Sequence, residues 1–234
     1  MSTMVLYRIE HLSDEATIRS KDHRPRGCVD EATRPAFTEL ALNEKKVASG
    51  YYKGEIVHAE GRPIQGWWHG EPIEEVVAVE LMTAYYNRKA KYLVVEAPHE
   101  LAVAAIARLN RDCRQQLRLK RVRLDFDTLI DSKPRPEIRG CWSRSEKDEI
   151  RSRAAFTGAD LRNNAEFKQI RKSGKLSNLR LVCEFSDREL RVSISRLASV
   201  CFFNEASLET RLRFVQHLAD EFEAKGKPRA AAKR

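Results

Sequence analysis

Three acidic residues at predicted strand ends could support metal chemistry. Glu96 follows the predicted strand Tyr92–Val95, and Asp125 and Asp127 lie on the next predicted strand, Arg118–Leu129. Acids at the ends of neighbouring parallel strands can converge on a divalent metal ion, as metal-dependent phosphodiester hydrolysis requires. These three residues are therefore the candidate catalytic residues of a nuclease-like site. The alternative is that they form ordinary ion pairs with nearby arginines.

One stretch resembles a known nuclease layout. The segment VVEAPHELA, followed by LDFD, resembles the strand-end Glu and the later D-x-D motif of Toprim domains. Ala97 stands where that family usually has Gly, and a single helix separates the two acidic points where the family has an additional strand and helix. The resemblance covers only residues 94–127. It implies metal-dependent chemistry at Glu96, Asp125 and Asp127.

Positive charge is concentrated in one part of the chain. The formal net charge is +9, and the stretch Leu117–Arg180 holds seventeen Lys and Arg against nine Asp and Glu. The tail Gly226–Arg234 adds four cations and no acid. A concentrated basic surface most often binds a phosphate backbone, through contacts that are mainly electrostatic. The charge pattern therefore predicts a partner that is DNA or RNA.

Cations and exposed aromatic rings are the residue types that hold a nucleic acid. Lysines and arginines position the phosphates, and rings can stack on bases. The candidate nucleic-acid-binding residues are Arg118, Lys120, Arg121, Arg123, Arg135, Arg139, Arg171, Lys172, Lys175, Tyr52 and Trp68. The alternatives are a solvated face of paired charges for the cations and burial in the core for the rings.

Several common chemistries have no motif in the sequence. The five cysteines are scattered without a C-x-x-C pair, the six histidines have no metal-ligand spacing, and there is no G-x-G-x-x-G, Walker or G-x-S-x-G motif. We expect no cofactor and no metal site from these residues. The leading hypothesis is a cytoplasmic nucleic-acid-binding protein without catalytic activity and without a membrane segment. A protein-interaction module, such as an inhibitor or assembly subunit that uses an aromatic hairpin, remains an alternative.

The pattern predicts an α+β fold with a mixed sheet, a central βαβ-like unit, two β-hairpins and a C-terminal amphipathic helix. In the first part we expect a strand at Val5–Ile9, a brief helix after Ser13, a helix at Pro35–Lys46, a hairpin from Tyr51–His58 and Ile64–His69, and a helix that begins at Pro72 and ends before Arg88. The hairpin contains the aromatic pairs.

In the second part the predicted elements are the strand Tyr92–Val95, a helix at Glu100–Gln116, a parallel strand at Arg118–Leu129, helices at Ser143–Phe156 and Asp160–Lys172, a hairpin at Leu179–Ile194 and a helix from Leu208 to Ala224. The predicted domains are residues 1–130, an α/β region with the aromatic hairpin, and residues 131–225, a basic region of helices and a hairpin packed on the first. Residues 226–234 are predicted to be a disordered basic tail.

Overall fold

The structure is a computed structural model that describes residues 2–23, 35–48, 50–68, 71–144, 153–157, 160–173 and 176–224. The chain divides into two compact units, Ser2–Lys120 and Arg121–Arg234, which we call the N-terminal and C-terminal units. The boundary between the units, after Lys120, lies closer to the N-terminus than the predicted boundary after residue 130. The predicted tail 226–234 lies outside the described residues.

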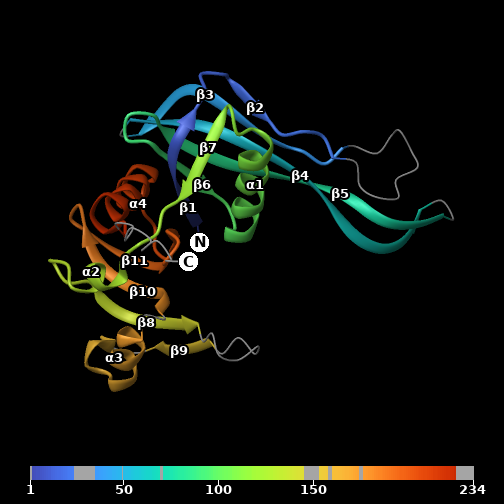
Figure 1. The fold of residues 1–234 in the computed structure, drawn as a ribbon. Coiled ribbons are helices and arrows are strands. Elements are labelled where there is room, and N and C mark those ends of the chain that lie inside the picture. Colours follow the sequence, from blue (N-terminus) through green and yellow to red (C-terminus); the bar gives the residue numbers. More distant parts are fainter. Residues whose placement is uncertain are drawn as a thin grey trace, which may run out of the picture. The chain divides into compact units, whose positions relative to one another are not determined.

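The N-terminal unit is an antiparallel sheet covered by one helix (Figure 1). Its strands follow the order β2–β3–β4–β5–β6–β1, and β7 also pairs with β1. The elements are β1 (Ser2–Leu12), β2 (Thr17–Arg19), β3 (Thr38–Ala48), β4 (Tyr51–Trp68), β5 (Glu71–Asn87), β6 (Tyr92–Glu96), α1 (His99–Asp112) and β7 (Leu117–Arg121).

The core of this unit forms between α1 and one face of the sheet. Buried residues of α1 recur at helical spacing at Ala102, Ala105, Ile106 and Leu109, as the sequence predicted. They join one cluster with buried strand residues such as Ile56. The helix and the strands Val5–Ile9 and Tyr92–Val95 are confirmed, although α1 ends at Asp112 and not at the predicted Gln116, and β1 and β6 extend beyond their predicted bounds.

Four predictions for the N-terminal unit were wrong. The predicted helices at Pro35–Lys46 and after Pro72 are the strands β3 and β5, and the segment after Ser13 forms β2. In place of the predicted hairpin between Tyr51 and His69, the structure has one continuous strand, β4, which pairs with β5; His69 lies outside the described residues. Pairing along the full length of these strands outweighed weak local helix preferences.

The C-terminal unit is a second antiparallel arrangement, with strand order β12–β11–β10–β8–β9. Its elements are α2 (Phe126–Ile130), β8 (Glu137–Arg144), β9 (Arg153–Thr157), η1 (Leu161–Asn163), α3 (Ala165–Lys172), β10 (Leu176–Phe185), β11 (Arg188–Ser195), β12 (Ser199–Phe202) and α4 (Leu208–Phe222). The two units together give the α+β class that the sequence predicted.

The hairpin of β10 and β11 and the helix α4 agree with the sequence. Ser186 and Asp187 both have positive φ, of 50° and 59°, so they form the two-residue turn that suits the twist of a hairpin. The ring of Phe214 on α4 lies 5.2 Å from that of Phe185 on β10 and 6.0 Å from that of Phe202 on β12. The helix therefore packs on one face of this sheet.

Three further predictions need correction. The predicted strand Arg118–Leu129 ends as β7 at Arg121, and Asp125 then begins the helix α2. The expected βαβ unit also fails, because β6 and β7 are not neighbours: each pairs with β1, which is antiparallel to β6. Every pairing whose register is described is antiparallel, so the predicted mixed sheet is not observed there.

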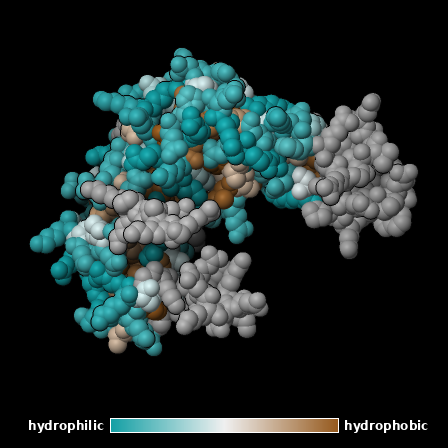
Figure 2. Space-filling view, viewed as in Figure 1, coloured by the Kyte–Doolittle hydropathy of each residue, from teal (hydrophilic) through white to brown (hydrophobic). Residues whose placement is uncertain are grey.

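The region predicted as helix from Ser143 to Phe156 contains the strand β9, and Ser143 itself belongs to β8. The helix predicted at Asp160–Lys172 is confirmed as η1 followed by α3. None of the described helices has both the length and the apolar character that a membrane span needs. The surface seen in Figure 2 is mostly hydrophilic, in keeping with the 33% of charged residues.

Candidate polyanion-binding face

Alternation along the strands gives the C-terminal sheet one apolar and one charged face. On β10, Leu179 and Leu181 are buried and Arg180 between them is exposed; on β11, Leu190 is buried and Arg191 is exposed. Successive side chains of a strand point to opposite faces. Because α4 packs on the apolar face, the two arginines belong to the other face, which we call the outer face.

Strand pairing brings a third arginine to the outer face. Val182 on β10 is the partner of Arg191 on β11 and of Glu137 on β8, so residues from these three strands form one row. Arg139 follows on β8. A depression of about 410 Å³ is lined by Glu137, Arg139, Arg180, Leu181, Val182, Glu189 and Arg191. Three arginines from three neighbouring strands therefore line one open site.

Two of these arginines have carboxylate partners that a ligand could replace. Arg139 Nη2 lies 2.9 Å from Glu137 Oε2, and Arg191 Nε lies 2.8 Å from Glu189 Oε1. The two arginine side chains are 44% and 63% exposed. Exposed ion pairs contribute only about 0–1 kcal/mol, so exchanging a carboxylate for a phosphate oxygen costs little.

Arg180 is held in a different way. Its guanidinium carbon lies 4.6 Å from the centre of the Phe203 ring, and none of the ion pairs among the described residues includes it. A guanidinium stacked on a ring keeps its in-plane N–H groups available, and those groups match two oxygens of a phosphate. The outer face can thus bind an anion through planar, bidentate contacts.

The predicted cations are distributed over both units. Arg139 lies in the depression, whereas Arg180 and Arg191 were not among the candidates, although the period-two pattern of the hairpin placed both opposite the apolar residues. Of the remaining candidates, those on exposed positions are Arg118, Lys120, Arg123, Arg135 and Lys172; Arg121 is half-buried, and Lys175 lies outside the described residues.

Arg171 makes a structural contact with two carboxylates. Its Nε lies 2.8 Å from Asp127 Oδ1, and its Nη1 lies 3.2 Å from Asp131 Oδ1. This pairing connects α3 to the region of α2. The same arginine, through its hydrogen bonds, holds the pKa of Asp131 below its usual value. Arg171 is therefore already engaged by two carboxylates.

The candidate acids also have local partners. The carboxylate of Asp125 caps α2 by accepting from the backbone N–H groups of Asp127 and Thr128, and Asp127 pairs with Arg171. Glu96 accepts hydrogen bonds from the hydroxyls of Ser2 and of Tyr85, the latter at 3.0 Å. Within the described ranges, no group of three or more His, Cys, Asp or Glu side chains is placed to hold a metal ion.

The two candidate rings have different outcomes. The half-buried Tyr52 stacks on Tyr86, with 5.6 Å between the ring centres, in the N-terminal unit. Tyr52 thus packs against a neighbouring ring of its own unit. Trp68 is the last residue of β4, and its side chain lies outside the described residues.

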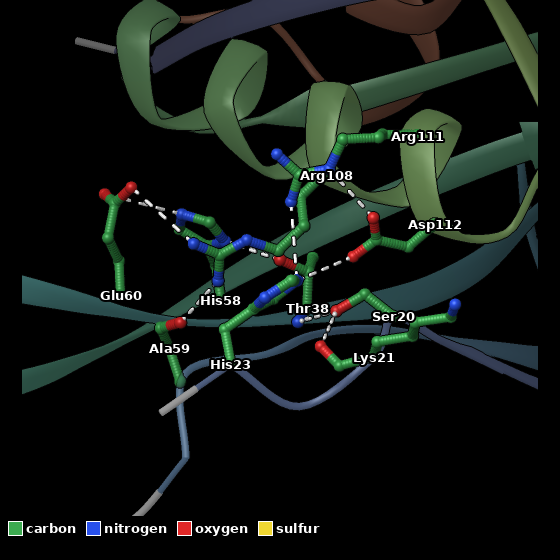
Figure 3. Close-up of polar contacts among 10 residues, drawn as sticks. All are labelled: Ser20, Lys21, His23, Thr38, His58, Ala59, Glu60, Arg108, Arg111 and Asp112. Carbon is green, nitrogen blue, oxygen red and sulfur yellow. Dashed lines mark hydrogen bonds and ion pairs between the residues drawn. The ribbon is translucent and has the colours of Figure 1, made fainter. Parts of the chain in front are cut away.

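A polar cluster in the N-terminal unit escaped the sequence reasoning (Figure 3). Thr38 Oγ1 and His58 Nδ1 share a hydrogen bond of 2.7 Å, and His58 Nε2 lies 3.7 Å from Glu60 Oε2. Arg108 of α1 donates to the carbonyl of Ala59 at 2.7 Å. Nearby, Asp112 pairs with His23 and Arg111, at 3.1 Å and 2.8 Å.

The order hydroxyl, imidazole, carboxylate is the order of a nucleophilic triad. Thr38 and His58 are, however, 0% and 1% exposed, so no substrate can reach the hydroxyl. Burial, followed by the charge of Arg108, lowers the pKa of His58 and favours the neutral ring. The cluster therefore acts as a buried connection between α1, β3 and β4. Sequence reasoning missed this pair because Thr38 lies in the segment Pro35–Lys46, which was predicted to be a helix and forms β3.

A second cavity lies in the C-terminal unit on the side of α4. It has a volume of about 250 Å³, and its lining includes Cys183, Phe185 and His217. Burial raises the pKa of Cys183 to about 11. Because the thiolate is the reactive form of cysteine, this residue is a poor nucleophile at neutral pH.

No protein-family model matches the sequence, and no curated protein matches it closely enough to count as a relative. The assignment of a function therefore depends on the geometry and charge of the sites described above.

Proposed function

We propose that this chain binds nucleic acid through phosphate contacts to the outer face of the C-terminal sheet, and that it has no catalytic activity of its own. One observation carries the proposal: Arg139, Arg180 and Arg191, from three neighbouring strands, line a single open depression. Guanidinium groups bind phosphates bidentately and stay charged at all physiological pH values.

The distribution of charge between the units supports the same partner. Residues 121–234 contain 25 Lys and Arg against 17 Asp and Glu, whereas residues 1–120 contain 18 against 17. Almost all of the net charge of +9 therefore belongs to the part of the chain that contains the outer face. A net positive field also speeds the encounter with a polyanion.

The test is the salt dependence of oligonucleotide binding, measured by fluorescence anisotropy. The variant Arg139→Gln, Arg180→Gln, Arg191→Gln removes the three cations of the depression. Each phosphate contact contributes about 0.7–0.9 to the slope of log K against log salt concentration, so the slope should fall by about 2–3 and the affinity with it.

A matched control distinguishes the effect of the outer-face arginines on binding from the effect of net charge alone. The variant Lys45→Gln, Lys89→Gln, Arg114→Gln removes three exposed cations of the N-terminal unit and changes the net charge equally. It should keep the wild-type slope. Equal slopes for the two triple variants, or binding that does not respond to salt, would contradict the proposal.

The absence of catalysis has its own test. We expect a labelled oligonucleotide to stay intact when it is incubated with the protein and Mg²⁺ or Mn²⁺. Cleavage that disappears in Asp127→Asn while binding persists would instead support the metal-dependent alternative.

A further inference from the structure

The strands β4 and β5 extend beyond the rest of the N-terminal sheet as a two-stranded ribbon (Figure 1). On one side, β5 pairs with β4 from Glu71 to Tyr86; on the other, it pairs with β6 only from Thr83 to Asn87. Among the strands that the structure describes, none pairs with this other side of Glu71–Met82. We call this stretch the β5 edge; it presents a long row of unpaired backbone groups.

Large apolar side chains gather on the β5 edge. Val76, Val79 and Leu81 are 38%, 47% and 79% exposed, and they are three of the four exposed large hydrophobic residues in the described part of the chain. Val79 and Leu81 are two residues apart, so they share a face of the ribbon. An edge strand that is both long and apolar is a template for a further strand.

Positive charge, one common protection of an edge strand, is missing here. Proteins commonly blunt such edges with lysines, yet β5 has neither Lys nor Arg in its whole length. Its charges are the four glutamates at positions 71, 74, 75 and 80. Of these, Glu80 pairs through its Oε1 with Arg62 Nη2 of β4 at 2.9 Å.

The negative charge of β5 indicates which kind of strand could pair with the β5 edge. A second copy of β5 would bring eight glutamates together, and like charges on adjacent strands are destabilising. A strand that alternates apolar residues with Lys or Arg would cover Val79 and Leu81 and offset the acids at the same time. We propose that the β5 edge is a strand-addition site for such a basic, extended segment of a protein partner.

The experiment uses the full chain and two synthetic peptides, one of alternating Lys and Val and one of alternating Glu and Val. Amide hydrogen exchange across Val76–Leu81 is measured by mass spectrometry with and without each peptide. The Lys-Val peptide should slow exchange at the β5 edge, and the Glu-Val peptide should leave it unchanged. A strand-added peptide protects backbone amides, whereas a peptide held only by surface charge does not.

Two variants sharpen the result. Leu81→Lys removes an apolar contact and adds a repulsive charge at a residue that is 79% exposed, so the fold should persist while affinity for the Lys-Val peptide falls at least about tenfold. Leu197→Lys changes the other exposed large hydrophobic residue, in the C-terminal unit, and should bind like wild type.

Three outcomes would overturn the proposal: no protection of the β5 edge by the Lys-Val peptide, equal protection by both peptides, or unchanged affinity in Leu81→Lys. Protection that appears without peptide and grows with protein concentration would assign the edge to a second copy of the chain instead. None of these measurements involves nucleic acid, so they are independent of the function proposed above.

Discussion

The hydrogen bond between Thr38 and His58 offers a direct test of the buried cluster. Both residues are almost fully buried, and the atoms Oγ1 and Nδ1 are 2.7 Å apart. The substitution Thr38→Val keeps the shape of the side chain and replaces the hydroxyl by a methyl group. It removes the partner of a buried ring nitrogen, which costs about 1–3 kcal/mol in the free energy of unfolding.

The assay is urea unfolding followed by far-UV circular dichroism. With an m value of about 2 kcal/mol/M, the loss lowers the midpoint by about 0.5–1.5 M. The control Thr83→Val makes the same chemical change at a half-buried residue of β5 and should shift the midpoint by no more than about 0.25 M.

A double-mutant cycle tests the reason for the loss. In a His58→Leu background no imidazole requires a partner, so the additional cost of Thr38→Val should shrink to nearly zero. If Thr38→Val unfolds at the wild-type midpoint, or costs as much in the His58→Leu background as in wild type, the argument from the buried hydrogen bond is refuted.

Three other predictions concern stability. Burial lowers the pKa of His58, so the unfolded chain takes up a proton at this residue more readily than the folded chain does. The melting temperature should therefore fall as the pH drops below the ordinary His pKa of 6.5. The substitution His58→Gln should make the melting temperature depend less on pH. Arg171→Met breaks the pairing with two half-exposed or exposed carboxylates and should cost about 1 kcal/mol in urea unfolding, whereas the exposed neighbour Lys172→Met should be neutral. Gly54→Ala would place a Cβ 2.8 Å from the carbonyl oxygen of Ala41 and should lower the free energy of unfolding by about 1–3 kcal/mol; wild-type stability would show that β3 shifts freely.

Elements with a strong local pattern were predictable from the sequence. The helix α1 repeats its buried residues Ala102, Ala105, Ile106 and Leu109 at helical spacing. The hairpin of β10 and β11 buries apolar residues at every second position, at Leu179 and Leu181 on β10 and at Leu190 and Val192 on β11. Such periodicities depend only on residues close in the chain. They fix the element without knowledge of its neighbours.

The strand β5 shows where that reasoning stops. Ile73, Val76, Val77 and Leu81 match helical spacing, and the glutamates near Pro72 suit a helix N-terminus. The same segment is rich in β-branched residues and ends in two tyrosines, which favour a strand. Continuous pairing with β4 decides between the two, and that pairing depends on a register the sequence does not display.

The outer face was only partly predictable for a similar reason. The net charge pointed to the region and to Arg139, but the depression forms because β10 pairs with both β8 and β11. The sequence analysis assigned part of β8 to a helix. It therefore did not predict that β8 lies beside the strand of Arg180, in the same sheet as the strand of Arg191. A charge count gives the amount of positive charge; strand order decides where it accumulates.

The pairing of β1 has a consequence for synthesis on the ribosome. Within the N-terminal unit, the neighbours of β1 are β6 and β7. Met4 can therefore pair only after Glu96 has been synthesised, and Tyr7 can pair only after Leu93 has been synthesised. These residues of β1 are fully or almost fully buried once the sheet is complete. While the intervening segments are being translated, the nascent chain carries this apolar strand without a partner, and exposed apolar strands of this kind are prone to aggregation.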